Sequence, residues 1–134
     1  MFVVTQLGQM RLLSCAINKQ SPDNLVLRLF VNDKVPLVTD VLSDYVEMSL
    51  VTGYVPKTLT GSSWSVGLNN SDIVVSSYAM QTFAFTSTVT SYGYYLTDNA
   101  GLVVILAERF KNTAILPFNG GNIKVTPSLA FGGC

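Results

Sequence analysis

The 134-residue sequence contains no histidine and has little charge of either sign. Without histidine, Ser-His and Cys-His nucleophile pairs and the commonest general base are excluded, which removes most hydrolases. Eight Lys and Arg residues balance eight Asp and Glu residues, so the formal net charge is zero. Such a chain has no positive field to attract nucleic acid or anionic lipid. We therefore expect no nucleic-acid partner.

Long apolar runs are also missing. The longest clear run, at 102–107, is far shorter than the roughly 18 residues that a membrane-spanning helix needs. The N-terminal residues lack the basic segment and apolar stretch of a signal peptide. We expect no membrane partner and no secretion signal.

The sequence has few residues that could bind a metal ion or form a disulfide. Its two cysteines, Cys15 and Cys134, lie near opposite ends and can pair only if the termini meet. We favour two free thiols, as in a reducing compartment. Without histidine or a Cys-x-x-Cys motif, the common zinc ligand sets cannot be assembled. The prediction is no metal ion and no cofactor.

Carboxylates are the remaining candidates for catalysis, because a glycosidase needs only two of them. Two of the acids fall in predicted turns, and none is paired with another on adjacent strands. The 33–47 stretch also lacks the spacing of an EF-hand calcium loop. We predict structural roles for these acids and no enzyme activity. The candidates are Asp40, Asp44, Glu47, Asp72, Asp98 and Glu108.

The composition is rich in apolar residues. Hydrophobic residues make up 49% of the chain and charged residues only 12%, against about a quarter in typical proteins. Few charges promote association, and obligate interfaces resemble a hydrophobic core cut in half. We predict that much of the surface is buried against neighbouring chains.

Turn signals divide the chain into short strands. Apolar spacing predicts a helix within Val4–Asn18, and 35–54 is an acidic connection that suits either a helical turn or a loop. The strands are expected at 25–31, 63–67, 73–76, 81–86, 123–127 and in both arms of a hairpin, 92–110, closed by Thr97–Gly101. This pattern favours one all-β domain, a jelly-roll-like β-sandwich at 21–134 preceded by a short helix or arm at 1–20.

The aromatic residues Trp64, Tyr78, Tyr92, Tyr94 and Tyr95 have two interpretations. They could form a sugar-binding platform, or they could pack in the core and against other strands. We favour packing, because that is the usual role of aromatic side chains in strands. Neighbouring residues of a strand point to opposite faces, so Glu108 and Arg109 are each expected to meet another strand or another chain, and Arg109 suits an interface.

Eight segments carry a resemblance to a known family. They are NLVLRLFVN (24–32), GY (53–54), KTLT (57–60), Trp64, QTF (81–83), YGYYLT (92–97), AERF (107–110) and IKVTPSL (123–129). Together they resemble a family of small tailed-phage virion proteins and cover nearly the whole chain. One departure is Leu106, where relatives often carry Trp before the AERF motif.

The resemblance implies a non-enzymatic virion component. The expected role is a capsid decoration, or cement, protein on the outer surface of the phage head, which bridges subunits of the major capsid protein and forms a homo-oligomer such as a trimer. The alternative is a tail, neck or fibre-associated protein, which could include a carbohydrate-binding role. The residues expected at interfaces are Leu7, Met10, Arg11, Leu12, Trp64, Arg109 and Phe110.

Overall fold

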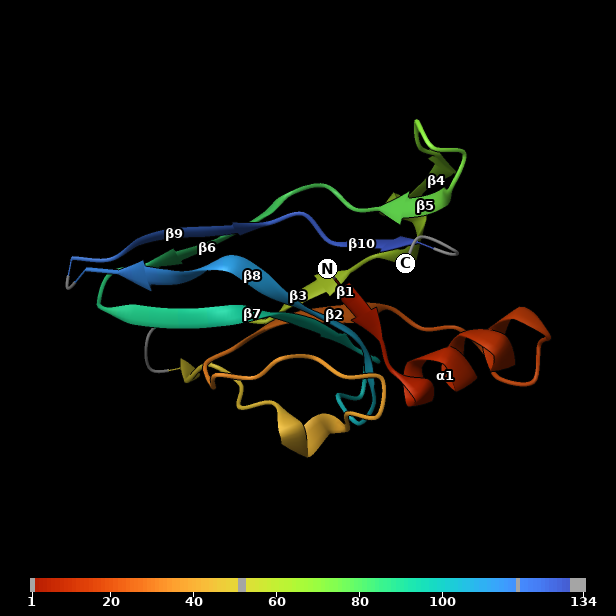
Figure 1. Ribbon diagram of the computed structural model, residues 1–134, viewed down its shortest axis with the longest axis horizontal. Helices are drawn as coiled ribbons and strands as arrows, with labels where there is room; N and C mark the ends of the chain where they lie inside the picture. Colours follow the sequence, from red (N-terminus) through yellow and green to blue (C-terminus); the bar gives the residue numbers. More distant parts are fainter. Residues whose placement is uncertain (1, 51–52, 118, 131–134) are drawn as a thin grey trace.

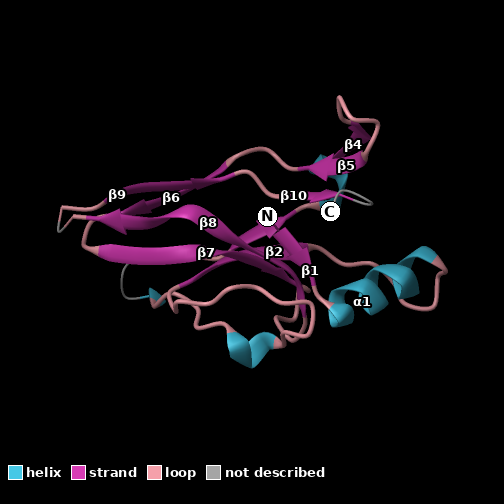
Figure 2. Cartoon of the chain, viewed as in Figure 1, coloured by secondary structure: helices cyan, strands magenta, loops and turns pink. Residues whose placement is uncertain are grey.

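The computed structural model describes residues 2–50, 53–117 and 119–130, and antiparallel strands dominate it (Figures 1 and 2). The expected class, an all-β sandwich with a short N-terminal helix, is confirmed. The elements are β1 (Phe2–Val4), α1 (Gln6–Ala16), β2 (Leu25–Phe30), β3 (Lys57–Leu59), β4 (Ser65–Leu68), β5 (Val74–Ser77), β6 (Gln81–Phe85), β7 (Val89–Thr97), β8 (Val104–Leu116), β9 (Gly121–Val125) and β10 (Ser128–Ala130).

One layer is a five-stranded sheet in the order β1-β8-β7-β2-β3. The hairpin predicted at 92–110 is present as β7-β8, in the middle of this sheet. Its turn is fixed by Gly101, whose φ of 74° favours glycine. The Oδ1 atom of Asp98 also accepts hydrogen bonds from the backbone N–H groups of Leu102 and Val103, at 2.8 and 3.1 Å.

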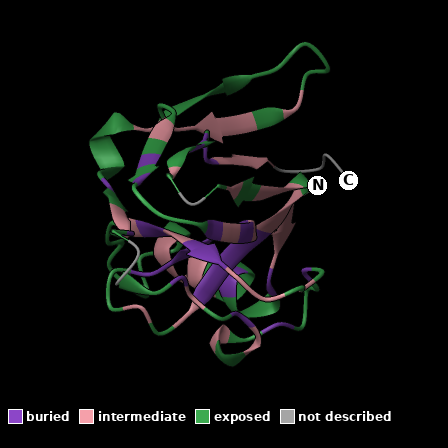
Figure 3. Cartoon of the chain, turned by 90° about the vertical axis from the view of Figure 1, so that its left-hand side faces the viewer, coloured by how far each residue is buried: buried purple, intermediate pink, exposed green. Residues whose placement is uncertain are grey.

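The second layer contains two small sheets, β6-β9 and β10-β5-β4. Strand β5 continues into β6 and β9 continues into β10, so the two sheets form one long ribbon (Figure 1). The β4-β5 hairpin extends from the far end of this ribbon. In Figure 3 it reaches out from the body, and its residues are mostly exposed or intermediate.

The main core lies between the layers. Phe83 and Phe85 of β6 and Ile123 and Val125 of β9 are all buried, and burial alternates along both strands. They pack against buried side chains of the five-stranded sheet, including Leu27, Leu29, Tyr94, Leu96 and Leu106.

Helix α1 covers part of the outer side of the five-stranded sheet. Thr5 caps the helix by accepting a hydrogen bond from the backbone N–H of Gly8 at 2.9 Å. A Cβ atom at Gly8 would lie 2.1 Å from the carbonyl oxygen of Ile105, so the helix packs directly on the backbone of β8. Because Phe2–Val4 also pairs with β8, the N-terminal segment is joined to the sandwich rather than set apart from it.

The connection 31–50 covers the rest of that side. It is mostly loop, with a 3-10 turn at Leu42–Asp44. Tyr45 stacks on Tyr95 at 5.2 Å and meets the ring of Phe30 edge-on at 5.2 Å. This connection therefore forms an outer layer with a second small core beneath it.

Candidate interaction surface

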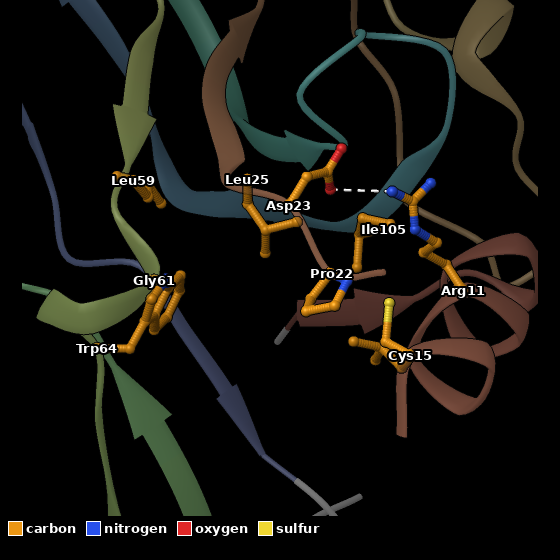
Figure 4. A pocket seen from close by; sticks show the side chains of 10 residues that line it. Arg11, Cys15, Pro22, Asp23, Leu25, Leu59, Gly61, Trp64 and Ile105 are labelled. Atoms are coloured by element: carbon orange, nitrogen blue, oxygen red, sulfur yellow. Dashed lines mark hydrogen bonds and ion pairs between the residues drawn. The ribbon is translucent and has the colours of Figure 1, made fainter. Parts of the chain in front are cut away.

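An apolar crevice opens between α1 and the segment that joins β3 to β4 (Figure 4). Its volume is about 190 Å³. Figure 4 shows Arg11 and Cys15 of α1 on one side and Gly61 and Trp64 on the other. The lining residues are Arg11, Leu12, Cys15, Pro22, Asp23, Leu25, Leu59, Gly61, Trp64 and Ile105. Most of these are apolar, so the crevice suits an apolar side chain.

The charge of Arg11 is neutralised inside the chain. Its guanidinium lies 2.9 Å from Asp23 and 3.4 Å from Asp98. Burial alone would lower the pKa of Arg11, but the hydrogen bond with Cys15 and the two carboxylates raise it. The guanidinium therefore stays charged and paired.

A second apolar hollow adjoins the first. It has a volume of about 240 Å³ and shares Leu25 and Trp64 with the crevice, while Val66, Ser76, Leu96 and Leu129 complete its lining. Trp64 stands between the hollows and meets Tyr78 edge-to-face at 5.3 Å. The two hollows thus form an apolar opening between α1 and the β4-β5 hairpin.

The outward face of α1 is also apolar. Met10, Leu13 and Ile17 are 57%, 65% and 69% exposed. At 100° per residue, Met10 and Leu13 lie on the side of the helix opposite Gly8, which touches the sheet, and Ile17 follows at the C-cap of the helix. The segment 35–41 lies beside the start of this helix, because the N–H of Gln6 donates to the carbonyl oxygen of Val38 at 2.7 Å. It exposes Val35, Leu37, Val38 and Val41.

Six of the seven predicted interface residues fall into three places. Arg11, Leu12 and Trp64 line the crevice, while Leu7 and Met10 are exposed on α1. Phe110 packs against the main core, with its ring 6.4 Å from that of Tyr94.

Arg109 is engaged within the chain. It forms an ion pair with Asp33 at 2.6 Å and donates to the carbonyl oxygen of Lys34 at 3.1 Å. Its guanidinium also lies over the ring of Tyr92, 5.2 Å from the centroid. Within the chain, Arg109 thus contacts the 32–34 turn and Tyr92 of β7, and its contact with another chain stays a prediction.

Sequence reasoning missed Leu13 and Ile17. The sequence shows their spacing with Met10. It does not show which side of the helix faces solvent, because that depends on the contact of Gly8 with the sheet.

Two of the candidate carboxylates, Asp40 and Glu47, accept hydrogen bonds from neighbouring groups of the fold. Asp40 accepts hydrogen bonds from the hydroxyl of Tyr45 at 2.7 Å and from the N–H of Leu37 at 2.8 Å. Glu47 pairs with Arg28 at 2.9 Å and accepts from the hydroxyl of Tyr54 at 2.6 Å. The bonds of Asp40 link residues within the connection 31–50, and the pair of Glu47 with Arg28 joins this connection to β2.

Three of the remaining acids lie in a 3-10 turn, in a β-turn and on a strand. Asp44 accepts from the N–H of Val41 at 2.8 Å, and Asp72 lies in the β4-β5 turn with a φ of 59°. Glu108 is opposite Tyr94 in the β7-β8 pair, and burial together with this carboxylate raises the pKa of Tyr94.

The five aromatic residues do not form one platform. Tyr94 and Tyr95 are buried in separate cores on the two sides of the sheet. Tyr92 contacts Arg109, and only Trp64 and Tyr78 contact each other. The packing interpretation is therefore the one that these contacts support.

Two further findings concern the described residues alone. Among them, no three Cys, Asp or Glu side chains lie close enough to hold a metal ion, and no helix is long and apolar enough to cross a membrane. Cys15 is a free thiol, whereas Cys134 lies outside the described residues. Comparison of the chain with protein-family models, with curated proteins and with solved structures finds no match.

Proposed function

We propose that this chain is a structural protein of a tailed-phage virion, and specifically a capsid decoration protein that bridges subunits of the major capsid protein. The observation that carries the proposal is the exposed apolar surface. Among the described residues, seventeen large apolar side chains are exposed on a chain of zero net charge. A surface of this kind is suited to burial in an assembly.

The outward face of α1 is the proposed contact with the capsid. Full burial of a side chain such as Met10, Leu13 or Ile17 contributes roughly 1.5–3 kcal/mol. The cap at Thr5 and the contact at Gly8 hold this helix in place before binding. Little ordering is then needed when it docks, so more of the burial energy remains as affinity.

The function needs no covalent step. Each bound copy would add interface area between capsid subunits, and that area would oppose the outward pressure of packaged DNA. Many copies acting together would multiply a modest contribution from each.

Binding to undecorated capsid shells tests the proposal. The purified chain should sediment with expanded shells of the major capsid protein, and Leu13→Lys should weaken this binding by about tenfold or more, because it places a charge in an apolar contact. The control is Ser71→Lys, which adds the same charge at an exposed position in the β4-β5 turn and should bind like wild type. Wild-type protein that does not bind shells, or equal binding by Leu13→Lys, would overturn the proposal.

A further inference from the structure

Strand β4 ends the β10-β5-β4 sheet, and all four of its residues are exposed. Val66 and Leu68 are 75% and 67% exposed. We propose that β4 pairs with β4 of a second copy of this chain across a twofold axis, which joins two three-stranded sheets into one of six strands.

The free edge offers unused hydrogen-bonding groups. Asn69 and Ile73 form a hydrogen-bonded pair, because the N–H of Asn69 donates to the carbonyl oxygen of Ile73 at 3.0 Å. From there the pairing of β4 with β5 continues without a shift to Ser65 and Ser77. Hydrogen-bonded and non-bonded pairs alternate in an antiparallel ladder. Ser65 and Gly67 therefore bond toward β5, and the backbone groups of Val66 and Leu68 point outward.

This edge lacks the usual protection against pairing. Natural edge strands carry charges, prolines or bulges, or another segment covers them. Among the other strands that end sheets, β3 and β9 carry Lys57 and Lys124, and the uncharged strands β1, β6 and β10 have half-buried or buried residues. Strand β4 has no charge and no proline, and its pairing with β5 is regular over all four residues.

One symmetric register pairs the outward backbone groups of both Val66 and Leu68 within the strand. With Gly67 of both copies on the axis, Val66 of each copy faces Leu68 of the other, and both pairs use the outward backbone groups. Val66 and Leu68 alternate with Gly67, so they lie on one face of the ribbon and form an apolar cluster with their counterparts.

The paired residues carry no charge that would oppose the contact. Asp72 is the single charged residue between Lys57 and Asp98, and it lies in the turn beyond β4. No like charges are therefore brought together. A Cβ atom at Gly67 would meet nothing within 4 Å, so the backbone there is open to approach.

The dimer is a property of the isolated chain and does not rest on the proposed function. Sedimentation velocity of the purified protein at a series of concentrations should show a monomer–dimer equilibrium. Gly67→Lys should raise the dissociation constant by about tenfold or more, because two lysines would face each other on the axis. Ser71→Lys is again the matched control and should dimerise like wild type. A wild-type chain that remains monomeric at every concentration, or a Gly67→Lys variant that dimerises equally well, would overturn the proposal.

Cross-linking tests the register itself. In a Cys15→Ser, Cys134→Ser background, Gly67→Cys should give a disulfide-linked dimer on non-reducing gels. A non-bonded antiparallel pair places its Cα atoms about 4.5 Å apart, which is within the range of a disulfide. Ser71→Cys lies four residues from the axis and should remain uncross-linked. Equal cross-linking at both positions would contradict this register.

Discussion

Gly8 shows how one residue decides whether α1 can reach the sheet. Most helices gain stability when an interior glycine becomes alanine, because glycine is the more flexible residue in the unfolded chain. Here a Cβ atom would lie 2.1 Å from the carbonyl oxygen of Ile105 and 2.7 Å from its Cα atom. Backbone atoms of a central strand cannot move aside as a side-chain tip can.

Gly8→Ala should therefore destabilise the protein by about 1–3 kcal/mol, the usual cost of overpacking, instead of stabilising it. Thermal or urea denaturation followed by circular dichroism measures the change. Gly61→Ala is the control, because a Cβ atom there would meet only the Oδ1 atom of Asn24, at an ordinary contact distance of 3.9 Å, and should have little effect. If Gly8→Ala were as stable as wild type, α1 would not pack on β8 as described.

Asp40 is a buried carboxylate whose charge is stabilised by its surroundings. Burial alone would raise its pKa, but the contacts with Lys34, Tyr45 and the N–H of Leu37 lower it below the ordinary value of 3.8. A lowered pKa in the folded state stabilises the protein above the unfolded pKa, and this contribution disappears as the pH falls through the folded pKa. The relevant pH window thus lies below 3.8.

Asp40→Asn should cost about 1–3 kcal/mol near neutral pH, because it removes the charge from these hydrogen bonds and from the Lys34 pair. The difference from wild type should shrink as the pH falls below 3.8. Urea denaturation at neutral pH and in steps down the acid range tests both parts. The control is Asp72→Asn, a turn position at φ 59° that asparagine tolerates. A difference that does not change with pH would mean that the charge of Asp40 contributes nothing.

At the scale of elements, the connection 31–50 behaves as part of the fold rather than as a loose link. Tyr45 anchors it through the stack on Tyr95, the edge contact with Phe30 and the hydrogen bond to Asp40. A second attachment is the pair of backbone hydrogen bonds between Val31 and Val46 and between Met48 and Leu29, at 2.8 and 3.0 Å.

Tyr45→Ala should cost about 3–5 kcal/mol, the range for removing a large buried aromatic side chain. Tyr45→Phe keeps the ring contacts and loses only the hydrogen bond, so it should cost about 1–2 kcal/mol. Chemical denaturation gives both values, and hydrogen exchange should show faster opening of 31–50 in the alanine variant. Equal stability of the two variants would show that the ring contacts do not hold the connection.

Elements with local signals could be predicted from the sequence. The Thr97–Gly101 turn carries its own turn residues, and the alternation at 81–86 and 123–125 marks strands with one buried face. The role of 31–50 could not be predicted, because Tyr45 meets Tyr95 and Phe30 only after the sheet has formed. The pairing of Arg109 with Asp33 likewise depends on two distant segments.

At the scale of the whole molecule, apolar surface is spread over several regions. Exposed apolar side chains occur on α1, on 35–41, on the β4-β5 hairpin and at Leu102 and Ile115. With zero net charge, the isolated protein has little electrostatic protection against association. Low charge and exposed apolar side chains are both expected of a subunit that works inside a larger assembly.

Cryo-electron microscopy of the intact virion tests the proposed function most directly. Our account predicts density for this chain repeated over the icosahedral head, between neighbouring capsomers, with Met10, Leu13 and Ile17 of α1 against the major capsid protein. Density confined to the tail axis or to fibres, with none on the head, would contradict the decoration role.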